Sequence, residues 1–105
     1  MKIYVAGKYS ADNIIEVLHN IREGIKISAK LIKMGHSPFC PFLDHQFSFY
    51  EDISVPEYYK YSIDFLKVCE AMLVLKGYET SKGTLKEIEI AEEMGIPIYY
   101  SLEEI

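Results

Sequence analysis

A three-layer α/β fold with a parallel sheet is predicted by three features of the sequence. Short apolar runs alternate with longer segments in which apolar residues recur every three or four positions, so strands alternate with helices. Glycine or proline stands at several of the boundaries between these segments. The chain of 105 residues has the length of one domain. Because parallel strands need crossover connections, the alternation predicts helices on both faces of one sheet.

The first half of the chain supplies two strands, one helix and a long loop. Residues 2–6 form a short apolar run closed by a glycine, which is typical of a buried strand. A helical period of apolar residues covers residues 13–34, and Gly35 is its stop signal. Residues 37–41 can form a short strand between prolines. Residues 42–55 show no clear period, and we expect a long loop there.

The second half repeats the alternation. A helix is predicted over residues 56–70, with a proline in its first turn, where a missing N–H group has no consequence. A buried strand over residues 71–75 follows, then a helix over 80–94 and a last strand over 96–100. The complete order is βαβαβαβ. We expect a Rossmann- or flavodoxin-like fold with four or five parallel strands, built as a single domain over residues 1–105.

Composition and charge narrow the choice of partners. The chain has 11 Lys and Arg residues against 16 Asp and Glu residues, a formal net charge of −5. An acidic balance without a basic run disfavours nucleic acid, whose binding depends mainly on clustered positive charge. The first apolar run is too short for a signal peptide or a membrane span, so we expect a cytoplasmic protein with no membrane partner. Cys40 and Cys69 lack CxxC spacing and are expected to be small buried side chains.

Ligands of parallel α/β sheets bind beyond the carboxyl ends of the strands. The pattern around Ser81, Gly83 and Thr84 stands where a strand loop turns into a helix, and a helix N-terminus favours an anionic or hydroxyl-rich ligand. The loop after the first strand should open at the same edge, where Lys8 would add a charge and Ser10 a hydroxyl. The candidate ligand-binding residues of that loop are Gly7, Lys8, Tyr9 and Ser10.

Two acidic residues are candidates for catalysis at this edge. Glu87 lies one turn beyond Thr84 in the third predicted helix, and Asp64 lies among apolar neighbours on the second. Two carboxylates that converge on one crevice suit glycosidic chemistry, in which one attacks the sugar carbon and the other handles protons. The structural alternative for Glu87 is a capping box with Thr84, and for Asp64 an ordinary solvated position.

The segment between the second strand and the second helix has two further features. Residues 39–61 are rich in aromatic side chains, which suits a lid that stacks a base, the core, or a subunit interface. His45 is a candidate contact for a base or phosphate. His36, Cys40 and His45 lack a fourth ligand for a tetrahedral metal site, and we expect neither a metal nor another cofactor.

Three groups of residues, taken in order along the chain, form a recognisable pattern. The first is the start of the chain, Lys2-Ile3-Tyr4-Val5-Ala6-Gly7. The second is Asp64 ahead of Cys69-Glu70-Ala71-Met72. The third is Ser81-x-Gly83-x-x-x-Glu87, followed by Ala91 and Gly95-Ile96-Pro97. Together they resemble the nucleoside 2-deoxyribosyltransferase superfamily, which includes the 2′-deoxynucleoside 5′-monophosphate N-hydrolases. The resemblance covers nearly the whole chain.

The resemblance implies a covalent mechanism on a nucleoside or nucleotide. It makes Glu87 the nucleophile, gives Asp64 the proton transfers, and places Tyr4 near the nucleophile. Base-exchanging members usually have Asp where this chain has Ser81, whereas the monophosphate hydrolases have Ser, whose hydroxyl binds phosphate. The sequence therefore favours a nucleotide substrate.

The function expected from the sequence is cleavage of an N-glycosidic bond by hydrolysis or by base transfer. We also expect a homodimer or a higher homo-oligomer, because a subunit interface would cover exposed aromatic rings. The rival interpretation is a non-catalytic nucleotide-binding or sensing module, in which Glu87 only caps its helix.

Overall fold

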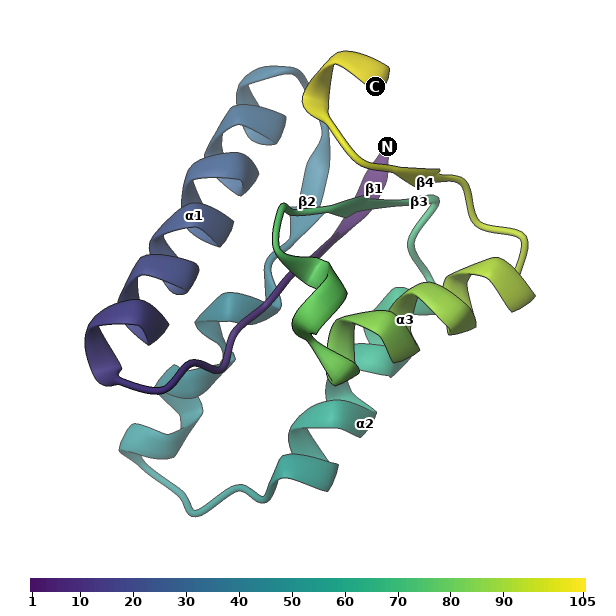
Figure 1. Ribbon diagram of the computed structural model, residues 1–105. Coiled ribbons are helices and arrows are strands. Elements are labelled where there is room, and N and C mark those ends of the chain that lie inside the picture. The colour runs from purple at the N-terminus through teal and green to yellow at the C-terminus, as the bar shows by residue number, and fades with distance from the viewer.

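The computed structural model describes all 105 residues. Its strands are β1 (Lys2–Ala6), β2 (Ser37–Phe39), β3 (Ala71–Val74) and β4 (Ile98–Tyr99). Its α-helices are α1 (Ile14–Lys33), α2 (Val55–Leu66) and α3 (Lys82–Glu93) (Figure 1). The strands pair in parallel in the order β2-β1-β3-β4. The α/β class and the all-parallel sheet are therefore confirmed, with four strands.

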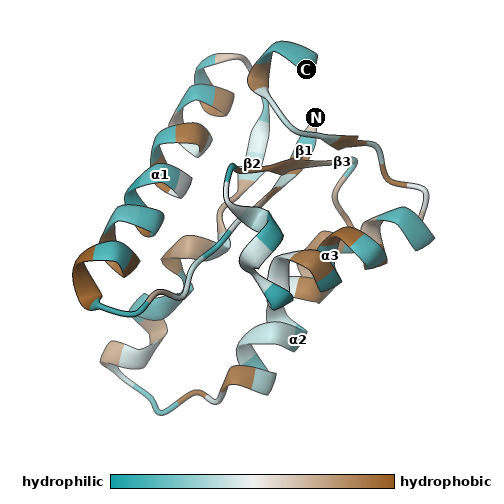
Figure 2. Cartoon of the chain, in the orientation of Figure 1, coloured by the Kyte–Doolittle hydropathy of each residue, from teal (hydrophilic) through white to brown (hydrophobic).

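Alternating side chains of the central strands build one core on each face of the sheet. On one face Ile3 and Val5 of β1 pack in a cluster with Ile21 and Leu31 of α1. On the other face Tyr4 and Ala6 belong to a cluster that α2 and α3 complete with Ile63, Leu66, Ile88 and Ala91. Figure 2 shows the hydrophobic colouring of the central strands between the helical layers. Because every second residue of a strand faces the same way, the Tyr4 side chain lies on the face of the sheet that α2 and α3 cover.

Local signals set where the helices begin and end. Asn13 caps α1 by accepting a hydrogen bond from the backbone N–H of Glu16, and Ser54 caps α2. Gly35 has a φ angle of +91°, a left-handed conformation that suits glycine after a helix end. Helix α2 ends at Leu66, four residues before the predicted end, because the chain must turn there to bring β3 beside β1.

The segment predicted as a loop contains a 3₁₀ helix, η1 (Pro41–Phe49). Such a helix has three residues per turn, so its apolar residues leave no amphipathic α-helical period in the sequence. Phe42 anchors η1 and is only 3% exposed. Its ring packs against Gly24 of α1 so closely that a Cβ at Gly24 would lie 2.4 Å from a ring carbon. A glycine on α1 thus sets the position of the segment after β2.

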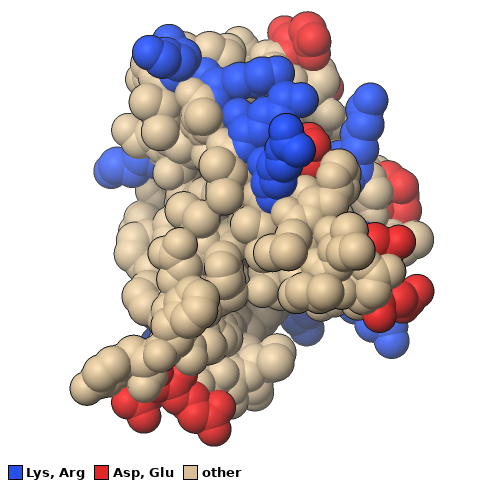
Figure 3. Space-filling view, turned by 90° about the vertical axis from the view of Figure 1, so that its left-hand side faces the viewer, with Lys and Arg blue, Asp and Glu red and all other residues tan.

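Charges on α1 follow the helix dipole. Glu16 stands in the first turn, whereas Lys30 and Lys33 stand in the last, where positive charge stabilises the partly negative helix end. Figure 3 shows Lys and Arg side chains gathered on the upper part of the face that α1 covers. None of the helices combines the length and the apolar character that a membrane crossing requires.

Candidate active site

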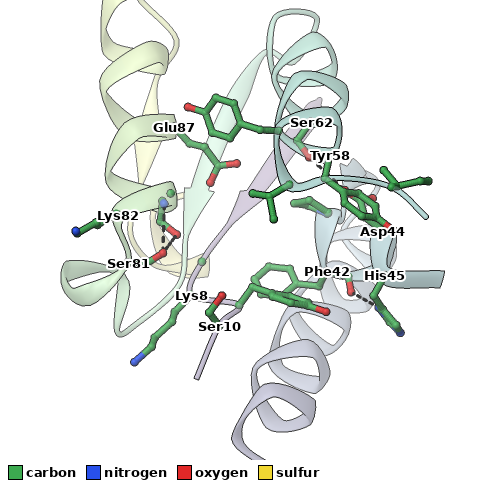
Figure 4. Close-up of a pocket in the computed structure, with 18 of the residues that line it drawn as sticks. Lys8, Ser10, Phe42, Asp44, His45, Tyr58, Ser62, Ser81, Lys82 and Glu87 are labelled. Carbon is green, nitrogen blue, oxygen red and sulfur yellow. Dashed lines mark hydrogen bonds between the residues drawn. The ribbon is translucent and has the colours of Figure 1, made fainter. Parts of the chain in front are cut away.

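A cavity of about 750 Å³ opens at the carboxyl ends of β1 and β3, at the edge predicted to bind the ligand. Its walls come from the loop after β1, from the η1–α2 segment and from the start of α3 (Figure 4). All the substrate-binding residues proposed from the sequence line it, namely Gly7, Lys8, Tyr9, Ser10, His45, Ser81, Gly83 and Thr84. The parallel topology thus brings together residues that lie far apart in the chain.

Glu87 is the acidic residue that α3 contributes to the cavity. Its carboxylate points into the space between α2 and α3 (Figure 4), and its Oε2 accepts a hydrogen bond from the hydroxyl of Tyr4. Burial raises the pKa of Glu87 from 4.5 to about 7, the Tyr4 hydrogen bond lowers the pKa, and the negative charge of Asp44 raises it. A carboxyl group with this pKa is partly ionised near neutral pH.

Tyr4 acts as a fixed donor to Glu87. Its side chain is fully buried on β1. Burial and the neighbouring Glu87 carboxylate raise the pKa of Tyr4, so the phenol keeps its proton at physiological pH. The predicted proximity of Tyr4 to Glu87 is therefore present as a hydrogen bond.

The capping box between Thr84 and Glu87 is not formed. The residue that caps α3 is Ser81, whose Oγ accepts hydrogen bonds from the backbone N–H of Thr84 at 3.3 Å and from its hydroxyl at 2.9 Å. Thr84 thus takes the third helical position, and Glu87 lies one turn further along and faces Tyr4. Glu87 is consequently free of the structural role that competed with catalysis.

The start of α3 forms the polar end of the cavity. The Ser81 hydroxyl accepts two hydrogen bonds but donates none within the protein, so its proton is available to a ligand. A side chain at Gly83 would meet no other atom within 4 Å, which leaves the first turn of α3 open. Lys8, Ser10 and Lys82 also line this part of the cavity, and the two lysine side chains extend outward from its rim (Figure 4). The helix N-terminus, the hydroxyl groups and the positive charge at the rim suit an anionic ligand.

The opposite wall carries a second acid, Asp44 of η1. Its Oδ2 accepts a hydrogen bond of 3.2 Å from the hydroxyl of Ser62, which faces it from α2. Burial raises the pKa of Asp44, while the Ser62 hydrogen bond and the neighbouring His45 lower it. His45 is held by a hydrogen bond of 3.1 Å from its Nδ1 to the carbonyl oxygen of Phe42. The cavity therefore contains two carboxyl groups, Glu87 and Asp44.

Asp64 does not reach the cavity, so the expected convergence of Asp64 and Glu87 is not met. The Asp64 side chain is 53% exposed and forms an ion pair of 2.8 Å with Lys60, one turn earlier on α2. The hydrogen bond from Lys60 lowers the pKa of Asp64, as for an ordinary surface acid. The reason is helical geometry, because Ser62 faces the cavity and a residue two positions later projects from nearly the opposite side of the helix.

Three residues of the aromatic segment 39–61, Phe42, Tyr58 and Tyr59, also line the cavity. The lining residues Asp44 and Ser62 were not identified from the sequence. The available signal for Asp44 was an acidic residue in the predicted loop after the second strand. Because this segment shows no apolar period, the sequence did not indicate where the Asp44 side chain points. The Tyr59 hydroxyl is buried without a hydrogen-bond partner. The chain contains no group of three or more His, Cys, Asp or Glu side chains arranged to hold a metal ion.

Comparison with solved structures identifies the fold. The chain is similar to the 2-deoxyribosyltransferase from the psychrotolerant bacterium Bacillus psychrosaccharolyticus, with a TM-score of 0.68 and 17% sequence identity, over 93% of this chain and 69% of that one. The predicted resemblance to this superfamily is thus confirmed at the level of the fold. No curated protein sequence matches the chain. Residues 1–100 match a family described as a domain of unknown function, DUF4406, and the protein belongs to that family.

Proposed function

We propose that this protein cleaves the N-glycosidic bond of a deoxynucleoside or its 5′-monophosphate, with Glu87 as the nucleophile. The observation that carries the proposal is the carboxylate of Glu87, which faces the cavity with a hydrogen bond from the buried Tyr4. A retaining glycosidase needs such a carboxylate on the sugar carbon. The fold shared with a 2-deoxyribosyltransferase supports the same class of chemistry.

The state of Glu87 suits a nucleophile at neutral pH. With a pKa of about 7, a large part of the population is ionised, and burial leaves the carboxylate less stabilised by water than an exposed one would be. The hydrogen bond from Tyr4 fixes Oε2. In the proposed first step a Glu87 oxygen forms a bond to C1′ as the C1′–N bond breaks, and the bonding electrons leave with the base. Water or a second base then displaces Glu87 from C1′.

The polar end of the cavity favours a substrate with a 5′-phosphate. The Ser81 hydroxyl and the open first turn of α3 offer donors to a dianion, and Lys8 adds a positive charge at the rim of the cavity. A nucleoside without phosphate would leave these groups unpaired. We therefore expect a higher kcat/KM for a deoxynucleoside 5′-monophosphate than for the matching nucleoside.

Release of free base tests the proposal. The folded protein is incubated with each common deoxynucleoside and its 5′-monophosphate, and free base is measured by chromatography. We expect release from at least one monophosphate, and exchange with an added second base if the protein is a transferase. Glu87→Ala should abolish turnover. Glu89→Ala is the matched control, because Glu89 is an exposed acid two positions further on α3.

Absence of release from every substrate by the folded protein would contradict the proposal. Binding of a monophosphate without turnover, unchanged by Glu87→Ala, would favour the non-catalytic nucleotide-binding module instead. Calorimetric titration of the wild type and of Glu87→Ala with the same monophosphates separates these two outcomes.

We also propose that the protein forms a homodimer or a higher homo-oligomer. The support is the pair of exposed aromatic side chains at the end of η1, where Phe49 is 85% and Tyr50 is 93% exposed. Exposed aromatic rings of this kind are typical of interaction surfaces. Light scattering coupled to size-exclusion chromatography measures the mass directly, and a monomer at all concentrations would contradict the proposal.

A further inference from the structure

We infer that Asp44 is the catalytic acid and base that protonates the departing base and then activates water. This inference rests on the proposed function, because it assigns a second catalytic residue to the same reaction. The position predicted from the sequence for this role, Asp64, lies outside the cavity and is paired with Lys60. Apart from Glu87, Asp44 is the acidic residue that lines the cavity.

The surroundings of Asp44 hold its carboxyl group in place and leave part of it free. The buried ring of Phe42, two residues earlier, anchors η1 against Gly24 of α1. The Ser62 hydroxyl donates to Oδ2, and no other protein group donates a hydrogen bond to the carboxyl group. Carboxyl oxygens accept or share several hydrogen bonds, so acceptor capacity remains for a substrate atom.

Burial raises the pKa of both carboxyl groups, and the negative charge of Asp44 raises the pKa of Glu87 to a smaller extent. A raised pKa favours the protonated form of Asp44, which is the form that a general acid must have. The other titratable side chains that line the cavity are Lys8 and Tyr9 from the loop after β1, His45 from η1, Tyr58 and Tyr59 from α2, and Lys82 from α3. Tyr4 of β1 donates a hydrogen bond to Glu87.

The chemistry balances with these two residues and water. In the first step the Asp44 carboxyl proton moves to a nitrogen of the departing base, the C1′–N electron pair stays with the base, and an oxygen of Glu87 bonds to C1′. In the second step the Asp44 carboxylate takes a proton from water, the water oxygen bonds to C1′, and the C1′–O bond to Glu87 breaks. Both residues return to their starting states, and one water molecule is consumed for each base released.

Leaving-group dependence tests this assignment. An ordinary base needs protonation to depart, whereas p-nitrophenolate departs unprotonated, so the p-nitrophenyl 2-deoxyriboside bypasses the acid. We expect Asp44→Asn to lower kcat/KM about 10²- to 10⁴-fold on the natural substrate and far less on the activated one in the glycosylation step. Asp52→Asn, which removes an exposed acid from the same segment, is the matched control. Asp64→Asn tests the position predicted from the sequence and should retain activity.

Each outcome decides between the two proposals. If the wild type releases no base from any substrate, the proposed function fails. The assignment of Asp44 fails if the wild type is active and Asp44→Asn is equally active. It also fails if Asp44→Asn loses kcat/KM on the natural and the activated substrate to the same degree, and in both cases the role of Glu87 as nucleophile stands. The assignment of Asp44 would also be overturned if Asp64→Asn lost as much activity as is expected for Asp44→Asn.

A measurement on the wild type covers the case in which Asp44→Asn does not fold. We expect kcat/KM for the natural substrate to fall as pH rises and the acid loses its proton, while kcat/KM for the activated substrate does not fall over the same range. Identical pH profiles for both substrates would overturn the assignment.

Discussion

Removal of the Tyr4 hydroxyl should move the pH range of the proposed N-glycosidic cleavage. In Tyr4→Phe the ring remains in the core, but Glu87 loses the hydrogen bond that lowers its pKa. A hydrogen bond to a charged group contributes about 1.5–3 kcal/mol, and about 1.4 kcal/mol corresponds to one pH unit. The acid limb of kcat/KM should therefore move upward by about one to two pH units. At pH 7 the ionised fraction of Glu87 should drop about five- to fifty-fold, and kcat/KM with it.

The assay is release of p-nitrophenolate from the p-nitrophenyl 2-deoxyriboside, measured from pH 5 to pH 10 for the wild type and Tyr4→Phe, because departure of this leaving group needs no acid. Activity of the variant should recover at alkaline pH, because Glu87 is then ionised without the hydrogen bond from Tyr4. Tyr100→Phe is the control, since Tyr100 is 46% exposed and does not line the cavity. An unmoved acid limb, or a loss of activity that is the same at every pH, would refute the reasoning that Tyr4 sets the ionisation of Glu87.

Three further predictions concern stability. The pKa of Glu87 is higher in the folded protein, about 7, than the 4.5 of an unperturbed group, so its contribution to stability is complete below pH 4.5 and is lost as pH rises through 7. Glu87→Gln should therefore be more stable than the wild type by about 3 kcal/mol at pH 8 and nearly equal to it at pH 4, measured by urea unfolding, and equal stability at pH 8 would contradict this. Gly24→Ala should lower the free energy of unfolding by about 1–3 kcal/mol and also lower kcat, because the new Cβ displaces the Phe42 ring that anchors η1. An unchanged melting temperature would argue against that contact. Tyr59→Phe removes a buried hydroxyl that has no partner and should raise the free energy of unfolding of the ligand-free protein by about 1 kcal/mol, whereas a loss of stability would reveal a partner for that hydroxyl.

Much of the fold and one side of the site could be predicted from the sequence. The apolar runs that became β1 and β3 are buried on both faces of the sheet, and such strands are recognisable from composition alone. The strand–helix alternation then determines a parallel sheet, and the carboxyl edge of a parallel sheet is where its loops gather. For this reason the residues from Gly7 to Ser10 and those around Ser81 could be assigned to one ligand site before their positions were known.

Only the tertiary structure decided which second acid lines the cavity that contains Glu87. Whether a helical residue points inward depends on how the helix is rotated against its neighbours, and two positions along α2 separate the buried Ser62 from the exposed Asp64. Asp44 lies on a 3₁₀ helix whose position is set by the contact of Phe42 with Gly24. That contact joins two separate segments, and the sequence pattern of neither segment indicates it. Local periodicity is a property of one segment, whereas a catalytic pair requires two segments at a fixed distance, and packing alone fixes that distance.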